Sequence, residues 1–144
     1  MKIDTSYQLE LNSLQAILKK RGLEERGHIQ KLCDSEVLRQ CEPYTPRDTG
    51  TLVNSGTLAT DIGSGVVEWN APYARYQYYG QLMVSPSTGS SWAKAGERKK
   101  KTDRELIYHG GGMRGKMWFA RWKADRGEEL IRKLAKVAGG EAGT

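Results

Sequence analysis

The stretch from Gly110 to Met117, GGGMRGKM, is the part of the sequence that comes nearest to a reaction motif. Gly110, Gly115 and Lys116 satisfy the G-x-x-x-x-G-K portion of a phosphate-binding loop, in which backbone amides and a lysine hold nucleotide phosphates. Met117, however, stands where a serine or threonine hydroxyl must reach the magnesium ion. No apolar strand ending in a metal-binding aspartate follows. The pattern therefore indicates a hinge before the last helix rather than a nucleotide site.

Catalytic and metal-binding side chains are sparse in the rest of the sequence. Its two histidines, His28 and His109, belong to no triad and no metal-ligand spacing. We expect His28 to be solvated at the start of a helix and His109 to lie in a loop. Cys33 and Cys41 are about 12 Å apart along one helix, whereas a disulfide needs Cα atoms within roughly 7 Å. The residues therefore predict two free thiols, no enzyme, no metal site and no cofactor.

A basic run, ERKKKTDRE, extends from Glu97 to Glu105, and five of its nine residues are lysine or arginine. Cations at this density can contact DNA phosphates, or an acidic protein, in a salt-sensitive manner. Three acidic residues interleave with them, which is also typical of a solvated surface. No recognition helix or RNA-binding signature frames the run, so base reading is not expected. The candidate contacts with DNA or an acidic partner are Arg98, Lys99, Lys100, Lys101 and Arg104.

A second unusual stretch, WNAPYARYQYYG, extends from Trp69 to Gly80, and five of its twelve residues are aromatic. Such a cluster suits a nucleic-acid stacking platform, the wall of an active site, a folding core or a contact surface for another protein. Tyrosines at three-residue steps form one ridge on a helical turn, beside an arginine that can stack or pair. Tyrosine and arginine are also enriched at the centres of interfaces. We therefore predict a subunit interface formed by Tyr73, Arg75, Tyr76, Tyr78, Tyr79 and Trp92.

Helices and a hairpin are expected to position these residues. Apolar residues at helical spacing predict a first helix ending at Gly22, a second ended by Pro43 and Pro46, and a last one from Met117 to about Ala138. Two short strands, Leu52 to Asp61 and Val66 to Asn70, are predicted to form a β-hairpin around GSG. The apolar positions are Leu11, Leu14, Ile17 and Leu18 in the first helix, Ile29, Leu32, Cys33, Val37 and Cys41 in the second, and Trp118, Trp122, Leu130, Ile131, Leu134 and Val137 in the last.

Length and charge limit the organisation of the chain. Its 144 residues suit one domain, 1–144, with one core. Residues 81–117 lack periodicity and are predicted to form an extended arm or insertion loop, and 139–144 a flexible tail. The formal net charge of +6 permits contact with nucleic acid or an acidic partner. No apolar run is long enough to span a membrane, and no signal peptide is evident, so residence in the cytosol is expected.

Two of these segments, in this order, resemble the minor capsid or neck proteins of long-tailed bacteriophages. That family shows a Y-x-P-x-x-x-G-x-L-x-x-S stretch, matched here by Tyr44, Pro46, Gly50, Leu52 and Ser55. A P-Y-A-R-x-Q block follows at Pro72 to Gly80, then TGSSW at Thr88 to Trp92, and then a terminal helix that begins with aromatic residues. The chain departs from the pattern between Trp92 and Met117, where the basic run and the glycines lengthen a connection that is usually shorter.

The resemblance implies a structural virion protein at the head–tail junction, made in the cytoplasm of the bacterial host. It implies a ring of six or twelve copies, related to tail-completion proteins, that binds other neck or tail proteins around the DNA channel. DNA in the channel is a further expected contact, of a non-specific kind. The implied fold is α+β, with N-terminal helices and a long C-terminal helix packed on a small antiparallel sheet, and a long extended arm. The competing hypotheses are a basic nucleic-acid-binding module and a phage-encoded nuclease.

Overall fold

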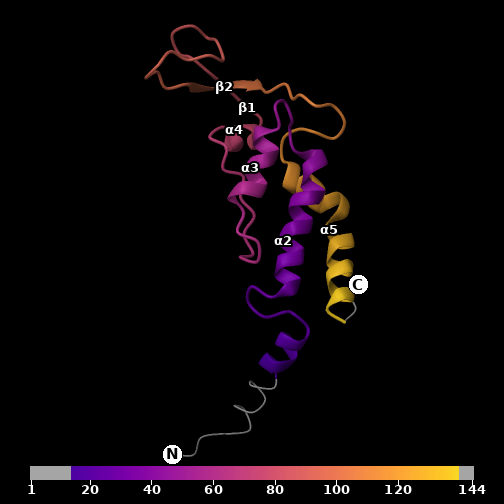
Figure 1. Ribbon diagram of the computed structural model, residues 1–144. Helices are drawn as coiled ribbons and strands as arrows, with labels where there is room; N and C mark the ends of the chain where they lie inside the picture. Colours follow the sequence, from indigo (N-terminus) through magenta and orange to yellow (C-terminus); the bar gives the residue numbers. More distant parts are fainter. Residues whose placement is uncertain (1–13, 140–144) are drawn as a thin grey trace, which may run out of the picture. The chain divides into compact units, whose positions relative to one another are not determined.

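The computed structural model describes residues 14–139, and Figure 1 traces their course. Residues 14–20 are helical. They are followed by α2 (His28–Cys41), the 3₁₀ turn η1 (Glu42–Tyr44), α3 (Thr51–Ala59) and α4 (Ala74–Tyr79). Two strands come next, β1 (Gln81–Val84) and β2 (Lys100–Glu105), and α5 (Trp118–Val137) completes the described chain. These helices and the small antiparallel sheet confirm the predicted α+β class. The predicted helical position at Leu11 and the tail beyond residue 139 lie outside the described residues.

The predicted ends of the N-terminal helices are confirmed. Gly22 has a φ of 72°, its amide donates to the Lys19 carbonyl, and the Leu23 amide donates to the Leu18 carbonyl. These two bonds form a Schellman motif, which satisfies the last carbonyls of a helix. At the other helix, α2 ends at Cys41, and Pro43 lies in the 3₁₀ turn that follows. Proline stops the helix there because it lacks an amide hydrogen.

The predicted hairpin between residues 52 and 70 is wrong. Residues Thr51–Ala59 form α3, and residues 66–70 have no strand partner. The burial of Leu52, Ser55 and Gly56 explains the difference, since positions i, i+3 and i+4 share one face of a helix. The Ser55 hydroxyl also donates to the Leu52 carbonyl, 2.7 Å away, a bond common for serine within helices.

The sheet of the described chain lies instead within the arm, residues 81–117. β1 pairs with β2 in antiparallel fashion, with Met83 opposite Lys101 and Val84 opposite Lys100. The register is irregular between Gln81 and Met83. Residues 85–99, which we call the β1–β2 loop, extend beyond the two strands (Figure 1). The last six residues of the basic run, Lys100–Glu105, thus form a strand, which their lack of apolar alternation did not indicate.

The described residues fall into two compact units. One comprises residues 14–39, 60–67 and 126–139, and the other comprises residues 40–59 and 68–125. In the first unit, Ile29, Val37 and Leu130 are buried, as is the carboxylate of Asp34. Asp34 Oδ2 accepts the amides of Gly63 and Gly65 at 2.8 and 3.1 Å, so one buried side chain holds the loop that leaves α3.

The second unit, which contains the aromatic block and the basic run, is built around two tryptophans. Trp118 is 2% exposed, and its ring meets those of Trp69 and Tyr78 edge to face, at 5.8 and 4.8 Å between centroids. The buried Trp122 indole donates to Gln40 Oε1 over 3.0 Å. Edge-to-face aromatic contacts of this kind stabilise a core beyond the area that they bury. The largest buried side chains of this unit are therefore aromatic.

The C-terminal helix is confirmed, but its predicted apolar stripe is only partly buried. Trp118, Trp122 and Leu130 are buried, whereas Ile131 and Val137 are 60% and 48% exposed. Ile131 comes nine residues after Trp122, which at 3.6 residues per turn places it on the opposite side of the helix. Among residues 14–139, no helix combines the length and the apolar character needed to cross a membrane.

Candidate binding groove

The C-terminal end of α4 sets the position of the aromatic block against the sheet. Gly80 follows α4 with a φ of 73°, and its amide donates to the Tyr76 carbonyl. A Cβ at this position would approach the Lys116 side chain to 2.9 Å and the Tyr108 hydroxyl to 3.1 Å. Glycine therefore suits both the left-handed conformation and the close packing. The chain reverses here, so that β1 begins directly after the tyrosines.

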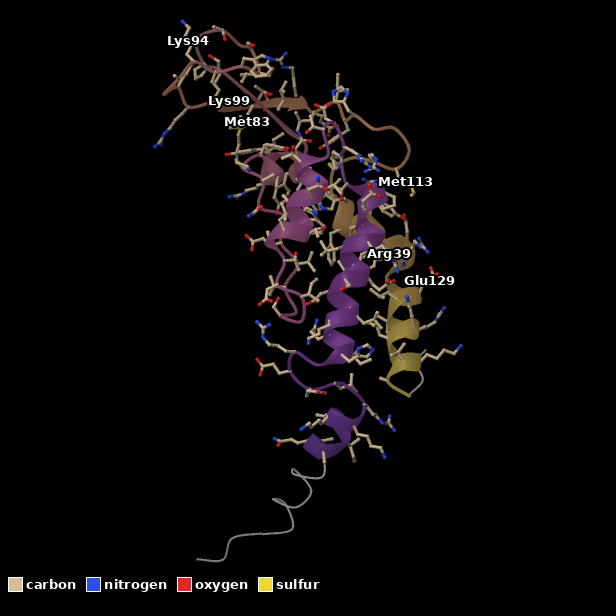
Figure 2. The ribbon with its side chains drawn as sticks, in the orientation of Figure 1. Arg39, Met83, Lys94, Lys99, Met113 and Glu129 are labelled. Carbon is tan, nitrogen blue, oxygen red and sulfur yellow. The ribbon has the colours of Figure 1, made fainter. Side chains whose placement is uncertain are left out.

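This reversal creates a groove of about 520 Å³, which we call the ribbon groove. Its walls come from α4 and the turn before it, from β1, and from the β1–β2 loop and Leu106, which flank β2; Figure 2 shows Met83 and Lys99 in the same region of this unit. Apolar side chains contribute most of its lining, and two cations stand among them. The lining residues are Pro72, Tyr73, Tyr76, Gln77, Gln81, Leu82, Met83, Ser91, Arg98, Lys99 and Leu106.

The structure brings together two sets of residues that the sequence presented separately. Tyr73 and Tyr76 belong to the predicted aromatic interface, and Arg98 and Lys99 to the predicted cationic contact. More than twenty residues separate the two sets along the chain. They meet because β2 pairs with β1, which begins two residues after α4 ends. Lys100, Lys101 and Arg104 lie on β2 itself, exposed and outside the groove lining.

The other predicted interface residues divide between core and surface. Tyr78 is half-buried, and its ring contacts Trp118 and Tyr79, so it contributes to the core. Tyr73 and Tyr79 are 40% and 56% exposed, and Arg75 is exposed as well. Trp92 is 84% exposed and lies in the β1–β2 loop.

A single carboxylate, Glu97, organises the β1–β2 loop. Its Oε1 accepts the hydroxyls of Ser85 and Ser87, both at 2.8 Å, and the Ser87 amide at 3.2 Å. Its Oε2 accepts the Lys94 amide at 3.1 Å. Hydrogen bonds from Ser85, and next from Ser87, lower the pKa of Glu97 to about 2, because each of them favours the charged form. We call this arrangement the Glu97 clasp; Figure 2 marks Lys94 on the outer part of the loop.

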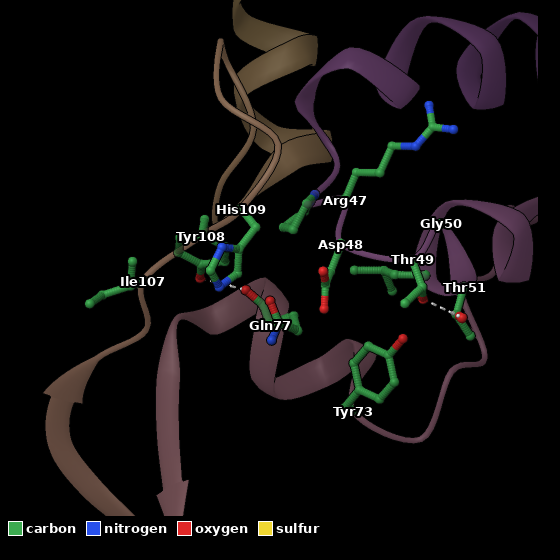
Figure 3. Close-up of a pocket in the computed structure, with 12 residues that line it drawn as sticks. Arg47, Asp48, Thr49, Gly50, Thr51, Tyr73, Gln77, Ile107, Tyr108 and His109 are labelled. Atoms are coloured by element: carbon green, nitrogen blue, oxygen red, sulfur yellow. Dashed lines mark hydrogen bonds between the residues drawn. The ribbon is translucent and has the colours of Figure 1, made fainter.

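The family-motif residues form a second, smaller hollow of about 160 Å³ beside α4, which we call the loop hollow (Figure 3). Pro46, Gly50 and Leu52 line it, together with Tyr73 and Gln77, which also line the ribbon groove. Tyr44 and Ser55 do not line the hollow. Tyr44 is 3% exposed and donates its hydroxyl to Asp125 Oδ2 at 3.0 Å, whereas Ser55 is bonded within α3.

The loop hollow also contains side chains able to do acid–base chemistry. Figure 3 shows the Asp48 carboxylate directed toward the space between His109 and Tyr73, while the Arg47 guanidinium points away. No hydrogen bond joins Asp48 to His109 among the described residues, and His109 is exposed, as His28 is. In the same part of the chain, no three His, Cys, Asp or Glu residues are grouped so that they could hold a metal ion. The hollow thus contains titratable groups without the contact that would activate one of them.

The glycine-rich segment is anchored rather than free. Arg114 donates Nη1 to the carbonyls of Glu42 and Thr45, at 2.7 and 2.6 Å, and Nη2 to Glu42 Oε1 at 2.9 Å. Lys116, the lysine of the phosphate-loop pattern, pairs with Glu105 Oε1 at 2.6 Å. Both cations therefore have structural partners. The glycine-rich segment, predicted to be a hinge, is therefore held in place by the bonds from Arg114 to the turn in which the family motif begins.

Sequence reasoning missed the two side chains that organise this unit, Glu97 and Arg114. Neither has a signal in local periodicity, because the serine partners of Glu97 are ten and twelve residues away and the partners of Arg114 about seventy. A comparison with models of protein families, with curated proteins and with solved structures finds no match for this chain.

Proposed function

We propose that this chain is a structural virion protein of the phage head–tail junction, which assembles as a ring and joins head to tail around the DNA channel. The order and spacing of the motif residues support the proposal. Tyr44, Pro46, Gly50, Leu52 and Ser55 precede the Pro72 to Gly80 block, and an aromatic-led helix follows. In the second unit these segments are neighbours: the motif turn and α4 both line the loop hollow.

One observation carries the proposal, the exposure of Trp92. Its side chain is 84% exposed, and the Glu97 clasp and a bond from its own amide to the Ser90 hydroxyl fix the loop that presents it. Tryptophan is enriched among the residues that contribute most to binding energy at protein interfaces, so its exposure on an ordered loop favours a contact with another protein. Tyr73, Tyr79 and Ile107 are further exposed apolar side chains of the same unit.

A ring requires two different patches on each copy, since each subunit meets its neighbours through heterologous contacts. The β1–β2 loop with Trp92 provides one patch. The exposed C-terminal end of α4, with Tyr79, provides a second one that is distinct in sequence. We propose that one patch of a copy contacts the other patch of the next copy, and that the remaining surface binds neighbouring neck or tail proteins.

The experiment is to locate the protein in intact particles by electron cryomicroscopy, and to complement a deletion of its gene with variants. Trp92→Ala should leave a folded protein, because the side chain is exposed, while heads and tails accumulate unjoined. Leu58→Ala is the matched control, since Leu58 is also 84% exposed but lies on α3, which contributes to neither patch. Particles that lack the protein would refute the virion role. Normal joining by Trp92→Ala would refute the role of the loop.

A further inference from the structure

The cations around β2 are less neutralised than the sequence suggests. Three acidic residues interleave with them between Glu97 and Glu105. Two of the three are occupied: the Glu97 clasp holds the first, and Glu105 pairs with Lys116 at 2.6 Å. Only Asp103 remains to balance the cations of the run. Among the described residues, no carboxylate pairs with Arg98, Lys99, Lys100, Lys101 or Arg104.

The ribbon groove adds flat apolar surface to this charge. Tyr73 and Tyr76 line it, and neither ring has an aromatic partner or a side-chain hydrogen bond within residues 14–139. Leu82, Met83 and Leu106 complete the apolar part of the lining. A volume of about 520 Å³ falls in the range of sites that enclose a small organic group, roughly 300–1,000 Å³.

We propose that the ribbon groove binds single-stranded nucleic acid. A base stacks on the ring of Tyr76 or Tyr73, and the adjacent phosphates are bound by Arg98 and Lys99. Aromatic platforms beside a cationic track are the means by which proteins bind single strands without sequence preference. The phosphates of a duplex can also pair with the cations, but its bases stay stacked inside the double helix. A duplex therefore leaves the rings of Tyr73 and Tyr76 without a stacking partner.

Charge complementarity decides against a second copy of the chain as the occupant. The protein carries a net charge of +6, so an unrelated surface of another copy offers no general attraction to a cationic rim. The carboxylates of an acidic peptide could pair with Arg98 and Lys99, but they would not stack on the two tyrosine rings of the groove. The proposal does not depend on the head–tail role, because an isolated protein presents the same groove.

The test measures fluorescence anisotropy of the full chain with labelled strands of about 12 nucleotides, a length that one such site can cover. The probes are oligothymidylate, oligouridylate, a DNA duplex of equal length and a polyglutamate peptide. We expect both single strands to bind more tightly than the duplex and the peptide. A difference between the first two probes distinguishes DNA from RNA as the natural ligand.

Two double variants and one single variant separate base stacking from general electrostatic attraction. Arg98→Gln with Lys99→Gln removes the groove cations and should lower the salt dependence of single-strand binding by about 1.4 in log–log slope. Lys100→Gln with Arg104→Gln removes the same charge from β2 outside the groove and should preserve the preference for single strands. Tyr76→Leu keeps the apolar lining and should weaken single-strand binding about 5- to 150-fold, with duplex binding unchanged.

Three results would each overturn the proposal: equal affinity for duplex and single strand, tighter binding of polyglutamate, or an unaltered single-strand affinity in Tyr76→Leu. Circular dichroism checks the fold of each variant. If Tyr76→Leu fails to fold, Tyr73→Leu provides the same test, since Tyr73 is 40% exposed and lines the same groove.

Discussion

Replacing Arg114 by alanine should destabilise the protein strongly, although the residue lies in a segment that reads as a loop. The side chain is 14% exposed, and it donates two hydrogen bonds to main-chain oxygens and one to the Glu42 carboxylate. A hydrogen bond from a charged donor contributes roughly 1.5–3 kcal/mol. The third bond adds little, because Glu42 is 36% exposed and water competes for it. The free energy of unfolding should therefore fall by about 3 kcal/mol, near the lower end of the two-bond sum, since water reaches part of the emptied site.

The assay is urea denaturation followed by tryptophan fluorescence. With a slope of about 2 kcal/mol/M, a loss of 3 kcal/mol lowers the midpoint by about 1.5 M. Arg47→Ala is the matched control: Arg47 pairs with the same Glu42 oxygen at 3.5 Å, but its side chain is 57% exposed. Such a pair contributes at most about 1 kcal/mol. If the two variants shift the midpoint equally, or if Arg114→Lys matches the parent protein, the reasoning from buried main-chain bonds is refuted.

Three further outcomes are expected. The pKa of Glu97 is lowered to about 2, so the clasp should stabilise the loop fully above about pH 4.5 and be lost as the pH falls toward 2. The chemical shift of the Ser87 amide should follow this titration, and in Glu97→Gln the pH dependence should disappear. Burial raises the pKa of Cys41 to about 12, so its thiol should resist alkylation at pH 8 until the protein unfolds, and rapid labelling of the native protein would contradict this. Gly80→Ala should cost more stability in thermal melts than Gly89→Ala, because both glycines have positive φ but only Gly80 has side chains within 4 Å of the added Cβ; equal losses would show that the crowding has no effect.

The helical part of the fold could be predicted from sequence because its signals are local. Gly22 and Pro43 mark helix ends through backbone chemistry that acts within a few residues. The long C-terminal helix follows from the spacing of Trp118, Trp122 and Leu130 in the same way. The prediction failed at α3, where turn-forming residues such as Ser55 and Gly56 are tolerated because they are small enough to be buried.

The candidate site could be predicted only in parts. The tyrosines of α4 and the cations of the basic run were identified separately, since composition is visible in a short window. Their proximity depends on the pairing of β1 with β2, and the cationic strand KKTDRE has no apolar alternation to indicate a strand. The partners of Glu97 and Glu105 could not be predicted either. The sequence does not show whether an acidic residue in a basic run pairs with the neighbouring cations or, as here, with residues outside the run.

The Glu97 clasp has a consequence for how the β1–β2 loop responds to damage. Four donors from three residues converge on one carboxylate, so losing that group releases both ends of the turn at once. These bonds should therefore weaken together as Glu97 is protonated, whereas main-chain bonds of the same loop, such as that from the Ser85 amide to the Ser90 carbonyl at 2.7 Å, do not depend on the carboxylate. Proteolysis of the segment around Trp92 should therefore become faster as the pH falls toward 2, while the contacts of Trp118 with Trp69 and Tyr78 and of Trp122 with Gln40, which involve no carboxylate, remain.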